Sequence, residues 1–362
     1  MHARSTSHSL TCLCSWDREI ELRLRAGCAL AVTGGSAFGG SETGAMNRSR
    51  LALQSVGVVT LLATLVVVAA LVLGDSGARG GRASARARSP AGERLRVPAA
   101  GPFRVLSIVC HAPSLGGRMP AEVYLPPGYG TTRRRYPVVY FLHGLPANPD
   151  SYRHNSFVAG ALLGAGQRAL VVAPQGARSK GSDREYLDWS PTEDWPRAIT
   201  YNLTSCVDHR FRTIASRRGR ALIGLSAGGY GALNIGLRNL QTFSAVEAWS
   251  GYIAATDPSG WHLLSFPSAV EQRNATIPDN LDLRAEMRRY PALIGFYCGR
   301  ADDRFAGTNE QLNRTLDAGR IWHVYRTYPG GHSGALWRAQ APKWLSLALT
   351  YLRTGRRPRS LG

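Results

Sequence analysis

The sequence predicts an α/β domain whose central sheet is mostly parallel and covered by helices on both faces, preceded by one N-terminal transmembrane or signal-anchor helix. From about residue 103 onward, short β-branched or aromatic runs alternate with helical patterns, which is typical of such a sheet. The later strand candidates are continuous apolar runs, as expected when both faces of a sheet are buried. Upstream, residues 51–73 form a run of 23 residues without charge.

The chain has 362 residues, and the part from about residue 101 onward has the size of one α/β domain. Hydrophobic residues make up 44% of the sequence, and the aromatic content of 9% excludes an intrinsically disordered chain. The formal net charge of +20 favours anionic surroundings. The arginines are scattered, however, and no DNA- or RNA-binding signature accompanies them, so we expect no nucleic-acid partner.

The apolar run at 51–73 is long enough for a transmembrane helix, because a rise of about 1.5 Å per residue spans the ~30 Å hydrocarbon core of a bilayer. It exceeds the usual apolar region of a signal peptide, which favours an uncleaved anchor over a cleaved signal. We therefore expect a single-pass protein of the cell membrane with its domain outside the cytoplasm. If the segment is cleaved, we expect a secreted protein.

The regions around this helix differ in composition. Residues 1–50 form an N-terminal tail, unless translation starts at Met46, where a basic stretch precedes the apolar run. Residues 74–100 are rich in Gly, Ala, Arg, Ser and Pro, which predicts a disordered linker. We expect the folded domain at 101–355 and a basic tail at 356–362.

The elements of the domain follow from its apolar runs and helical patterns. Strands are expected at 103–109, 121–125, 137–142, 169–173, 220–224, 244–249, 292–298 and 321–327. Helices are expected at 155–165, 195–214, 227–239, 281–290, 307–318 and 335–353. The first two strands have no helix between them, so the sheet is expected to open with an antiparallel pair.

Residues 224–228 match the pattern G-x-S-x-G, with Ser226 at its centre. The apolar run RALIG precedes the motif and a helical segment follows it. This strand–turn–helix context indicates a nucleophile elbow, in which a sharp turn exposes the serine hydroxyl. Glycines are expected on both sides because the turn leaves no room for Cβ atoms. The alternative is a serine that only caps the helix.

A serine hydroxyl needs a base to become an effective nucleophile. After a nucleophile elbow, the acid and the base follow in chain order. Asp302 comes directly after the run ALIGFYC, and His332 follows the run IWHVYRT in a loop. We predict that His332 takes the proton of Ser226 and that Asp302 fixes the tautomer of His332.

Other residues compete for these two roles. The neighbouring Asp303 is the alternative acid. His209 falls in a helical pattern and His323 in an expected strand, so both are poorly placed for catalysis. The alternative bases are His111, His154, His209, His262 and His323.

Acyl transfer also needs hydrogen-bond donors for the developing oxyanion. One is expected to be the backbone N–H of Ala227, the residue after the nucleophile. The second is expected in the loop after the strand PVVYFL, where we choose the N–H of Leu145. Gly144 permits the close approach of this loop, and His143 is expected to shape it.

Other features of the domain are less specific. Tyr186, Asp188 and Trp189 either line an acyl or alcohol pocket or serve packing. The domain contains three cysteines, so at most one disulfide forms. No cluster of residues has metal-ligand spacing, and we expect neither a metal nor a cofactor.

Several stretches resemble the esterase D/antigen 85 branch of the α/β-hydrolase superfamily, over about residues 103–353. They are YPVVYFLHG, the segment around Trp189, ALIGLSAGGYGALNIGLRN and the tail GRADDRF…YPGGHSGALWRAQ. The resemblance implies a single α/β-hydrolase fold. It also implies that the nucleophile, acid and base are Ser226, Asp302 and His332, with Leu145 and Ala227 as oxyanion donors.

The resemblance implies a serine carboxylesterase that works through an acyl-enzyme, and with the expected export it predicts a small-molecule or cell-envelope ester as substrate. An exported, anchored protein departs from the cytosolic S-formylglutathione hydrolases of the family. The first alternative is a mycolyltransferase-like acyltransferase to a sugar hydroxyl. That subset of the family usually has Glu as its acid and a bulkier residue after the nucleophile, whereas this chain has Asp302 and Ala227. The second alternative is a non-catalytic cell-surface binding protein on a hydrolase scaffold.

Overall fold

The computed structural model describes residues 103–180, 185–277 and 282–358. The expected N-terminal tail, apolar helix and linker, up to residue 100, lie outside these described residues, as does the end of the basic tail. Within the three described ranges, no helix is both long and apolar enough to cross a bilayer.

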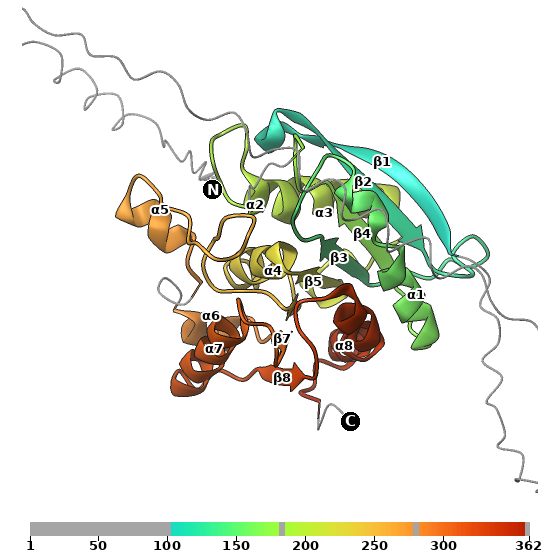
Figure 1. The fold of residues 1–362 in the computed structure, drawn as a ribbon. Coiled ribbons are helices and arrows are strands. Elements are labelled where there is room, and N and C mark those ends of the chain that lie inside the picture. Colours follow the sequence, from blue (N-terminus) through green and yellow to red (C-terminus); the bar gives the residue numbers. More distant parts are fainter. Residues whose placement is uncertain (1–102, 181–184, 278–281, 359–362) are drawn as a thin grey trace, which may run out of the picture. The chain divides into compact units, whose positions relative to one another are not determined.

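The described residues form an α/β-hydrolase-like fold around one eight-stranded sheet, with strand order β1-β2-β4-β3-β5-β6-β7-β8 (Figure 1). The strands β3 to β8 are mutually parallel. The hairpin of β1 and β2 is antiparallel and joins the sheet antiparallel to β4, which confirms the expected antiparallel opening. The strands are β1 (Arg104–Ala112), β2 (Gly117–Leu125), β3 (Val138–Leu142), β4 (Leu170–Pro174), β5 (Arg220–Leu225), β6 (Ala245–Trp249), β7 (Leu293–Gly299) and β8 (Val324–Tyr328).

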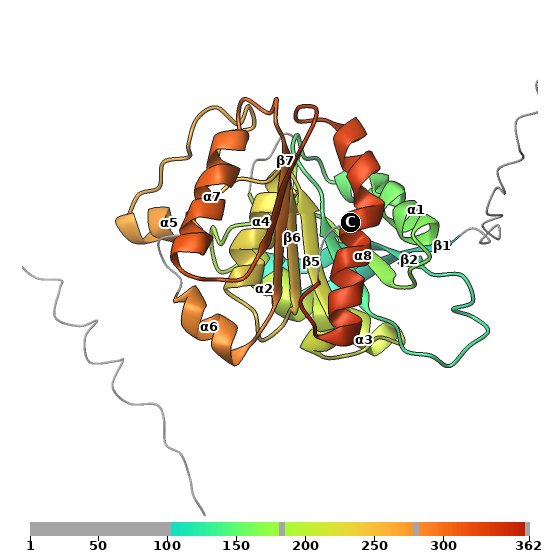
Figure 2. The ribbon, with the colours of Figure 1, turned by 90° about the horizontal axis from the view of Figure 1, so that it is seen from below.

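Helices cover both faces of the sheet (Figure 2). Helices α1 and α8 pack on one face, and α2, α3, α4 and α7 pack on the other. The helices are α1 (Ser156–Gly164), α2 (Trp195–Arg197), α3 (Thr204–Arg210), α4 (Ala227–Leu237), α5 (Ala269–Asn274), α6 (Leu283–Arg289), α7 (Ala306–Ala318) and α8 (Gly334–Thr354).

Two expectations about helices were wrong in detail. The single helix expected over 195–214 is divided by a π-helical segment, Ala198–Leu203, and ends at Arg210. It stops there because Phe211 takes an extended backbone, and the following Thr213 pairs with Tyr136 instead. Helix α5 was not expected, although Ser268 and the third helical residue, a glutamate, form a capping box at its start.

The core lies in two layers, one on each face of the sheet, and alternate residues of a strand enter different layers. In β3, for example, Tyr140 packs in the layer under α4, while Phe141 packs in the layer under α8. A disulfide joins Cys110 of β1 to Cys206 of α3, and Cys298 is a buried free thiol. One disulfide among three cysteines agrees with the cysteine count.

Candidate active site

Ser226 occupies the sharp turn between β5 and α4, where its backbone has φ 54° and ψ −124°. A positive φ is unfavourable for a residue with a side chain and persists only when the surroundings enforce it. Here the N–H of Ser226 donates to the carbonyl of Trp249 at 2.9 Å, and its carbonyl accepts from the N–H of Tyr230 at 3.0 Å. The strained turn is therefore held from both sides.

The two glycines of the motif are required by space. A Cβ atom at Gly224 would lie 2.1 Å from the carbonyl oxygen of Gly228. A Cβ atom at Gly228 would lie 2.1 Å from the carbonyl oxygen of Leu142, in β3. The expectation that the turn leaves no room for Cβ atoms is confirmed.

Three side chains from separate loops meet at the carboxyl ends of the parallel strands. His332 follows β8, and its Nε2 lies 2.9 Å from the Oγ of Ser226. Its Nδ1 lies 2.8 Å from the Oδ2 of Asp302, which follows β7. A carboxylate can only accept, so Nδ1 donates its proton to Asp302, which leaves Nε2 to accept from the serine hydroxyl.

The structure distinguishes Asp302 from its neighbour. The side chain of Asp302 is almost completely buried, whereas Asp303 is exposed. The turn after β7 fixes this choice, because the N–H of Asp302 donates to the carbonyl of Gly299, and the Oδ1 of Asp302 accepts from the N–H of Phe305.

The alternative histidines are placed elsewhere. His262 is paired with Asp257 at 3.0 Å, and its side chain is 80% exposed. His323 lies just before β8 rather than within it, and its Nε2 lies 2.9 Å from Asn313. The remaining three histidines are exposed to solvent; they are His111, His154 and His209.

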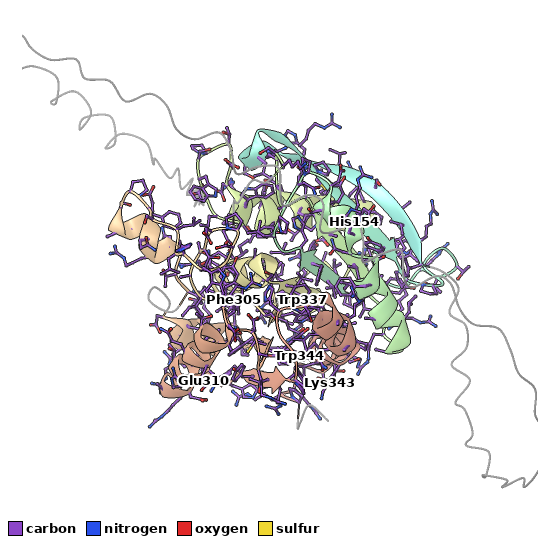
Figure 3. The ribbon with its side chains drawn as sticks, in the orientation of Figure 1. His154, Phe305, Glu310, Trp337, Lys343 and Trp344 are labelled. Carbon is purple, nitrogen blue, oxygen red and sulfur yellow. A yellow bond between two sulfur atoms is a disulfide. The ribbon has the colours of Figure 1, made fainter. Side chains whose placement is uncertain are left out.

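Aromatic rings hold the imidazole of His332 in place. Phe305 and Trp337 each meet it edge-on, with ring centroids at 5.1 and 5.0 Å, and Figure 3 shows Phe305 toward α7 and Trp337 toward α8. The indole N–H of Trp337 donates to the Oγ of Ser250, at 3.0 Å. The sequence analysis missed this pair, because aromatic residues close to a catalytic loop cannot be distinguished from core residues by pattern alone.

The loop after β3 lies directly against Ser226. A Cβ atom at Gly144 would lie 2.9 Å from the Cβ of Ser226, so the next residue, Leu145, starts beside this serine. Ala227 begins α4, and the first N–H groups of a helix have no acceptor within it. The two expected oxyanion donors therefore come from segments that flank the serine.

His143 helps to shape this loop. Its ring is buried, its Nδ1 lies 3.0 Å from the carbonyl oxygen of Gly144, and burial lowers its pKa, so it stays neutral. Its own carbonyl accepts a hydrogen bond from the hydroxyl of Tyr186, at 2.8 Å. Tyr186 therefore serves the packing of the loop rather than lining a pocket.

The buried carboxylate of Glu185 supports the site through two aromatic rings. The hydroxyl of Tyr252 donates to Glu185, at 2.6 Å, and the N–H of Thr256 donates to the same carboxylate. The ring of Tyr252 stacks on Phe305 with centroids 4.5 Å apart, and Phe305 in turn meets His332. The sequence gives no signal for Glu185, because its role depends on contacts with residues about 70 positions away.

The other two residues singled out near Tyr186 line a surface that does not include Ser226. Asp188 and Trp189 line a groove of about 730 Å³ beside the C-terminal half of α4. Trp189 stacks on Phe266 there, with ring centroids 5.6 Å apart. Over the ranges that the structure describes, no group of three or more His, Cys, Asp or Glu residues could hold a metal ion.

Comparison with protein families gives a match to the Esterase family model over residues 112–345. Esterase Rv1288 of Mycobacterium tuberculosis is 30% identical over 138 residues, which cover 38% of this chain and 30% of that protein. An endo-1,4-beta-xylanase/feruloyl esterase of Xylanibacter ruminicola is 31% identical over 151 residues, covering 38% of this chain and 20% of that protein. The match thus spans less than a third of the length of either relative.

Solved structures share the fold. A ferulic acid esterase superposes with a TM-score of 0.57 at 22% identity, covering 70% of this chain and 99% of that one. An S-formylglutathione hydrolase of Agrobacterium tumefaciens gives 0.57 at 20% identity, covering 70% and 97%. MPT51 of Mycobacterium tuberculosis gives 0.53 at 16% identity, covering 71% and 100%. At these identities, the likeness concerns the fold alone.

Proposed function

The chain belongs to the Esterase family, in the esterase D/antigen 85 branch of the α/β-hydrolases, and from this we propose that it is a serine carboxylic ester hydrolase. The observation that carries the proposal is the continuous series of hydrogen bonds from Asp302 through His332 to Ser226, on a strained elbow. This arrangement is the one that activates a serine for acyl transfer.

In the proposed reaction, the Oγ of Ser226 attacks the ester carbonyl while the Nε2 of His332 takes its proton. Asp302 stabilises the imidazolium that forms. The N–H groups of Ala227 and Leu145 donate to the oxyanion of the tetrahedral intermediate. The leaving alcohol then takes the proton from His332, which leaves an acyl-enzyme at Ser226. Water, deprotonated by His332, attacks the carbonyl of this ester. The bond to the Oγ of Ser226 then breaks, Oγ takes the proton back from His332, and the acid is released.

We also propose that the domain works outside the cytoplasm, attached to the membrane by the apolar segment at 51–73. The disulfide between Cys110 and Cys206 supports this location, because such bonds persist in oxidising compartments and are rare in the cytosol. The expected esterase substrates are then small-molecule or cell-envelope esters.

The test uses the purified full chain and a series of p-nitrophenyl esters from acetate to palmitate, together with a fluorophosphonate probe. We expect Ser226→Ala to lower kcat by about 10⁴-fold or more and to abolish labelling by the probe. Ser107→Ala, on the exposed side of β1, is the matched control and should keep full activity. If the wild-type chain neither hydrolyses these esters nor reacts with the probe, the binding-protein alternative takes the place of the esterase.

The same assay separates hydrolysis from acyl transfer when trehalose is added as an acceptor. Both reactions use the acyl-enzyme at Ser226, so the serine variant cannot distinguish them. Preference for short acyl chains, with rates unchanged by trehalose, supports the esterase. Preference for long chains, with acyl-trehalose as a product, supports the mycolyltransferase-like alternative.

A further inference from the structure

We propose that the domain docks on the surface of an anionic lipid bilayer through an arginine-lined face at the amino ends of its parallel strands. This proposal goes beyond ester hydrolysis and rests on the proposed membrane location of the chain. We call the surface formed by the two hollows described below the arginine face.

The first hollow of the arginine face has a volume of about 450 Å³. Its lining contains five arginines and no acidic residue. The five come from the segment before β3, the segment before β4, the turn before β5 and the end of α8. They are Arg134, Arg135, Arg168, Arg218 and Arg353.

The second hollow has a volume of about 300 Å³ and lies at the starts of β7 and β8. Its lining contains four arginines and, again, no acidic residue. These are Arg284, Arg288, Arg320 and Arg357. The two hollows adjoin the C-terminal end of α8, which contributes to both.

No acidic side chain among the described residues neutralises the charge of the arginine face. Among the residues that the structure describes, none of these nine arginines forms an ion pair. The hydrogen bonds that they do make are to neutral groups, as between Arg135 and the carbonyl of Thr213. A guanidinium offers five N–H donors suited to phosphate oxygens, so the face is complementary to phosphate groups.

Apolar side chains lie between the arginines. Ile214, which is 38% exposed, and the half-buried Leu352 line the first hollow, and the buried Leu349 lies at its base. In the second hollow, the guanidinium of Arg357 lies over the ring of Trp322, at 5.2 Å from its centroid. Basic and apolar groups on one face are typical of surfaces that contact lipid headgroups. These apolar side chains favour a bilayer over a soluble nucleic acid or polyphosphate.

The arginine face lies opposite the catalytic residues. Its segments precede β3, β4, β5, β7 and β8, whereas Ser226, Asp302 and His332 follow the carboxyl ends of β5, β7 and β8. Strands of this length separate the two edges by roughly 17–23 Å. A domain docked through the arginine face therefore keeps its nucleophile open to substrates on the side away from the membrane.

The chain enters the domain at the same edge. Phe103 precedes β1, whose first residue pairs with the last residue of β2. Because β2 runs antiparallel to β4, this point lies at the amino end of β4. Phe103 lines a small hollow that includes Gln167, and Gln167 also lines the first arginine hollow. A membrane segment at 51–73 followed by the linker would thus lead to the arginine face, which argues for lipid as its partner.

The experiment uses the full chain with nanodiscs of phosphatidylcholine alone or with about a third phosphatidylglycerol, and follows amide hydrogen exchange in the segments 132–137, 164–169 and 349–356. We expect exchange in these segments to be at least fivefold slower with the anionic discs at low salt, and the slowing to fade at high salt. Each arginine near an anionic surface strengthens binding by about fivefold. The triple variant Arg134→Gln, Arg135→Gln, Arg168→Gln should therefore weaken docking by about a hundredfold and lose the slowing.

The matched control removes the same charge from outside both hollows, as Arg118→Gln, Arg273→Gln, Arg314→Gln, and should keep the slowing. Equal exchange with both kinds of disc would overturn the proposal, as would equal losses in the two triple variants. Amide exchange could instead be slowed when double-stranded DNA or pyrophosphate is added to neutral discs, and not slowed by anionic discs. That result would replace lipid docking with a site for soluble anions. Ester hydrolysis by the same samples reports separately on Ser226. A failure of lipid docking can therefore be distinguished from a failure of the proposed esterase activity.

Discussion

Replacing Asp302 by asparagine tests how the candidate triad is held together. The Oδ1 of Asp302 accepts from the N–H of Phe305, at 3.3 Å, while Oδ2 faces the Nδ1 of His332, at 2.8 Å. An asparagine that keeps the first bond turns its NH₂ group toward His332. Nδ1 must then accept, the proton moves to Nε2, and the imidazole can no longer take the proton of Ser226. In the opposite orientation, the amide NH₂ group faces the N–H of Phe305. That bond is lost, because two donors then point at each other.

A histidine locked in the wrong tautomer lowers kcat by about 10⁴-fold, which corresponds to about 5.4 kcal/mol of transition-state stabilisation. We expect this loss for Asp302→Asn with p-nitrophenyl acetate, with KM changed little and the thermal unfolding midpoint close to that of the wild type. Asp303→Asn, one residue away and exposed, should stay within twofold of the wild type. The tautomer mechanism is refuted if Asp302→Asn keeps more than a tenth of kcat, or if Asp303→Asn loses as much.

Three further predictions concern stability. Burial raises the pKa of Glu247 well above its usual value, so the folded state keeps the proton of this carboxyl to higher pH than the unfolded chain does. Its contribution to stability is complete below the unfolded pKa and is lost as pH rises, by up to about 1.4 kcal/mol per pH unit. Glu247→Gln should therefore raise the unfolding midpoint at pH 8 but not at pH 4, and equal shifts at both would contradict this. Gly228→Ala places a methyl group 2.1 Å from a backbone carbonyl and should prevent soluble folding, whereas Gly307→Ala, in open space on α7, should stabilise the domain by up to about 1 kcal/mol in urea unfolding. Removing the disulfide with Cys110→Ser and Cys206→Ser should cost about 4–5 kcal/mol for a separation of 96 residues, measured by denaturant unfolding, and an unchanged stability would show that the thiols are not joined.

The parts of the fold that could be predicted are those with a local cause. The strands from β3 to β7 are largely apolar runs, and buried strands need such runs wherever they pair. The elbow at Ser226 could be located because its glycines and the flanking strand and helix are consecutive in the sequence. Helix boundaries depend on distant contacts: the end at Arg210 is set where Thr213 pairs with Tyr136, which is distant in sequence.

The parts of the site that could not be predicted depend on tertiary contacts. Asp302 and Asp303 are chemically identical neighbours, and only the turn after β7 decides which of them faces His332. Glu185 was missed because its partners Tyr252 and Thr256 come from a loop after β6. Residues that act through a neighbour have no motif of their own. Sequence patterns therefore identify the three residues of the candidate triad but not the residues that position them.

The contacts around Ser226 explain how its strained backbone can stay in position. Hydrogen bonding between neighbouring strands continues one step past their carboxyl ends: Ser226 donates to the last residue of β6, Ser250 to Tyr297 of β7, and Arg300 to Tyr328 of β8. The loops that carry Ser226 and Asp302 are thus each tied to the next strand, and neighbouring strands lie about 4.8 Å apart. The loop that carries His332 is tied to the Asp302 loop, because the N–H of Ala301 donates to the carbonyl of Gly330. The spacing of Ser226, Asp302 and His332 is consequently set by the sheet itself. Since positive φ at Ser226 costs free energy of order 1–3 kcal/mol, this shared ladder, rather than any single contact, is what keeps the hydroxyl beside its base.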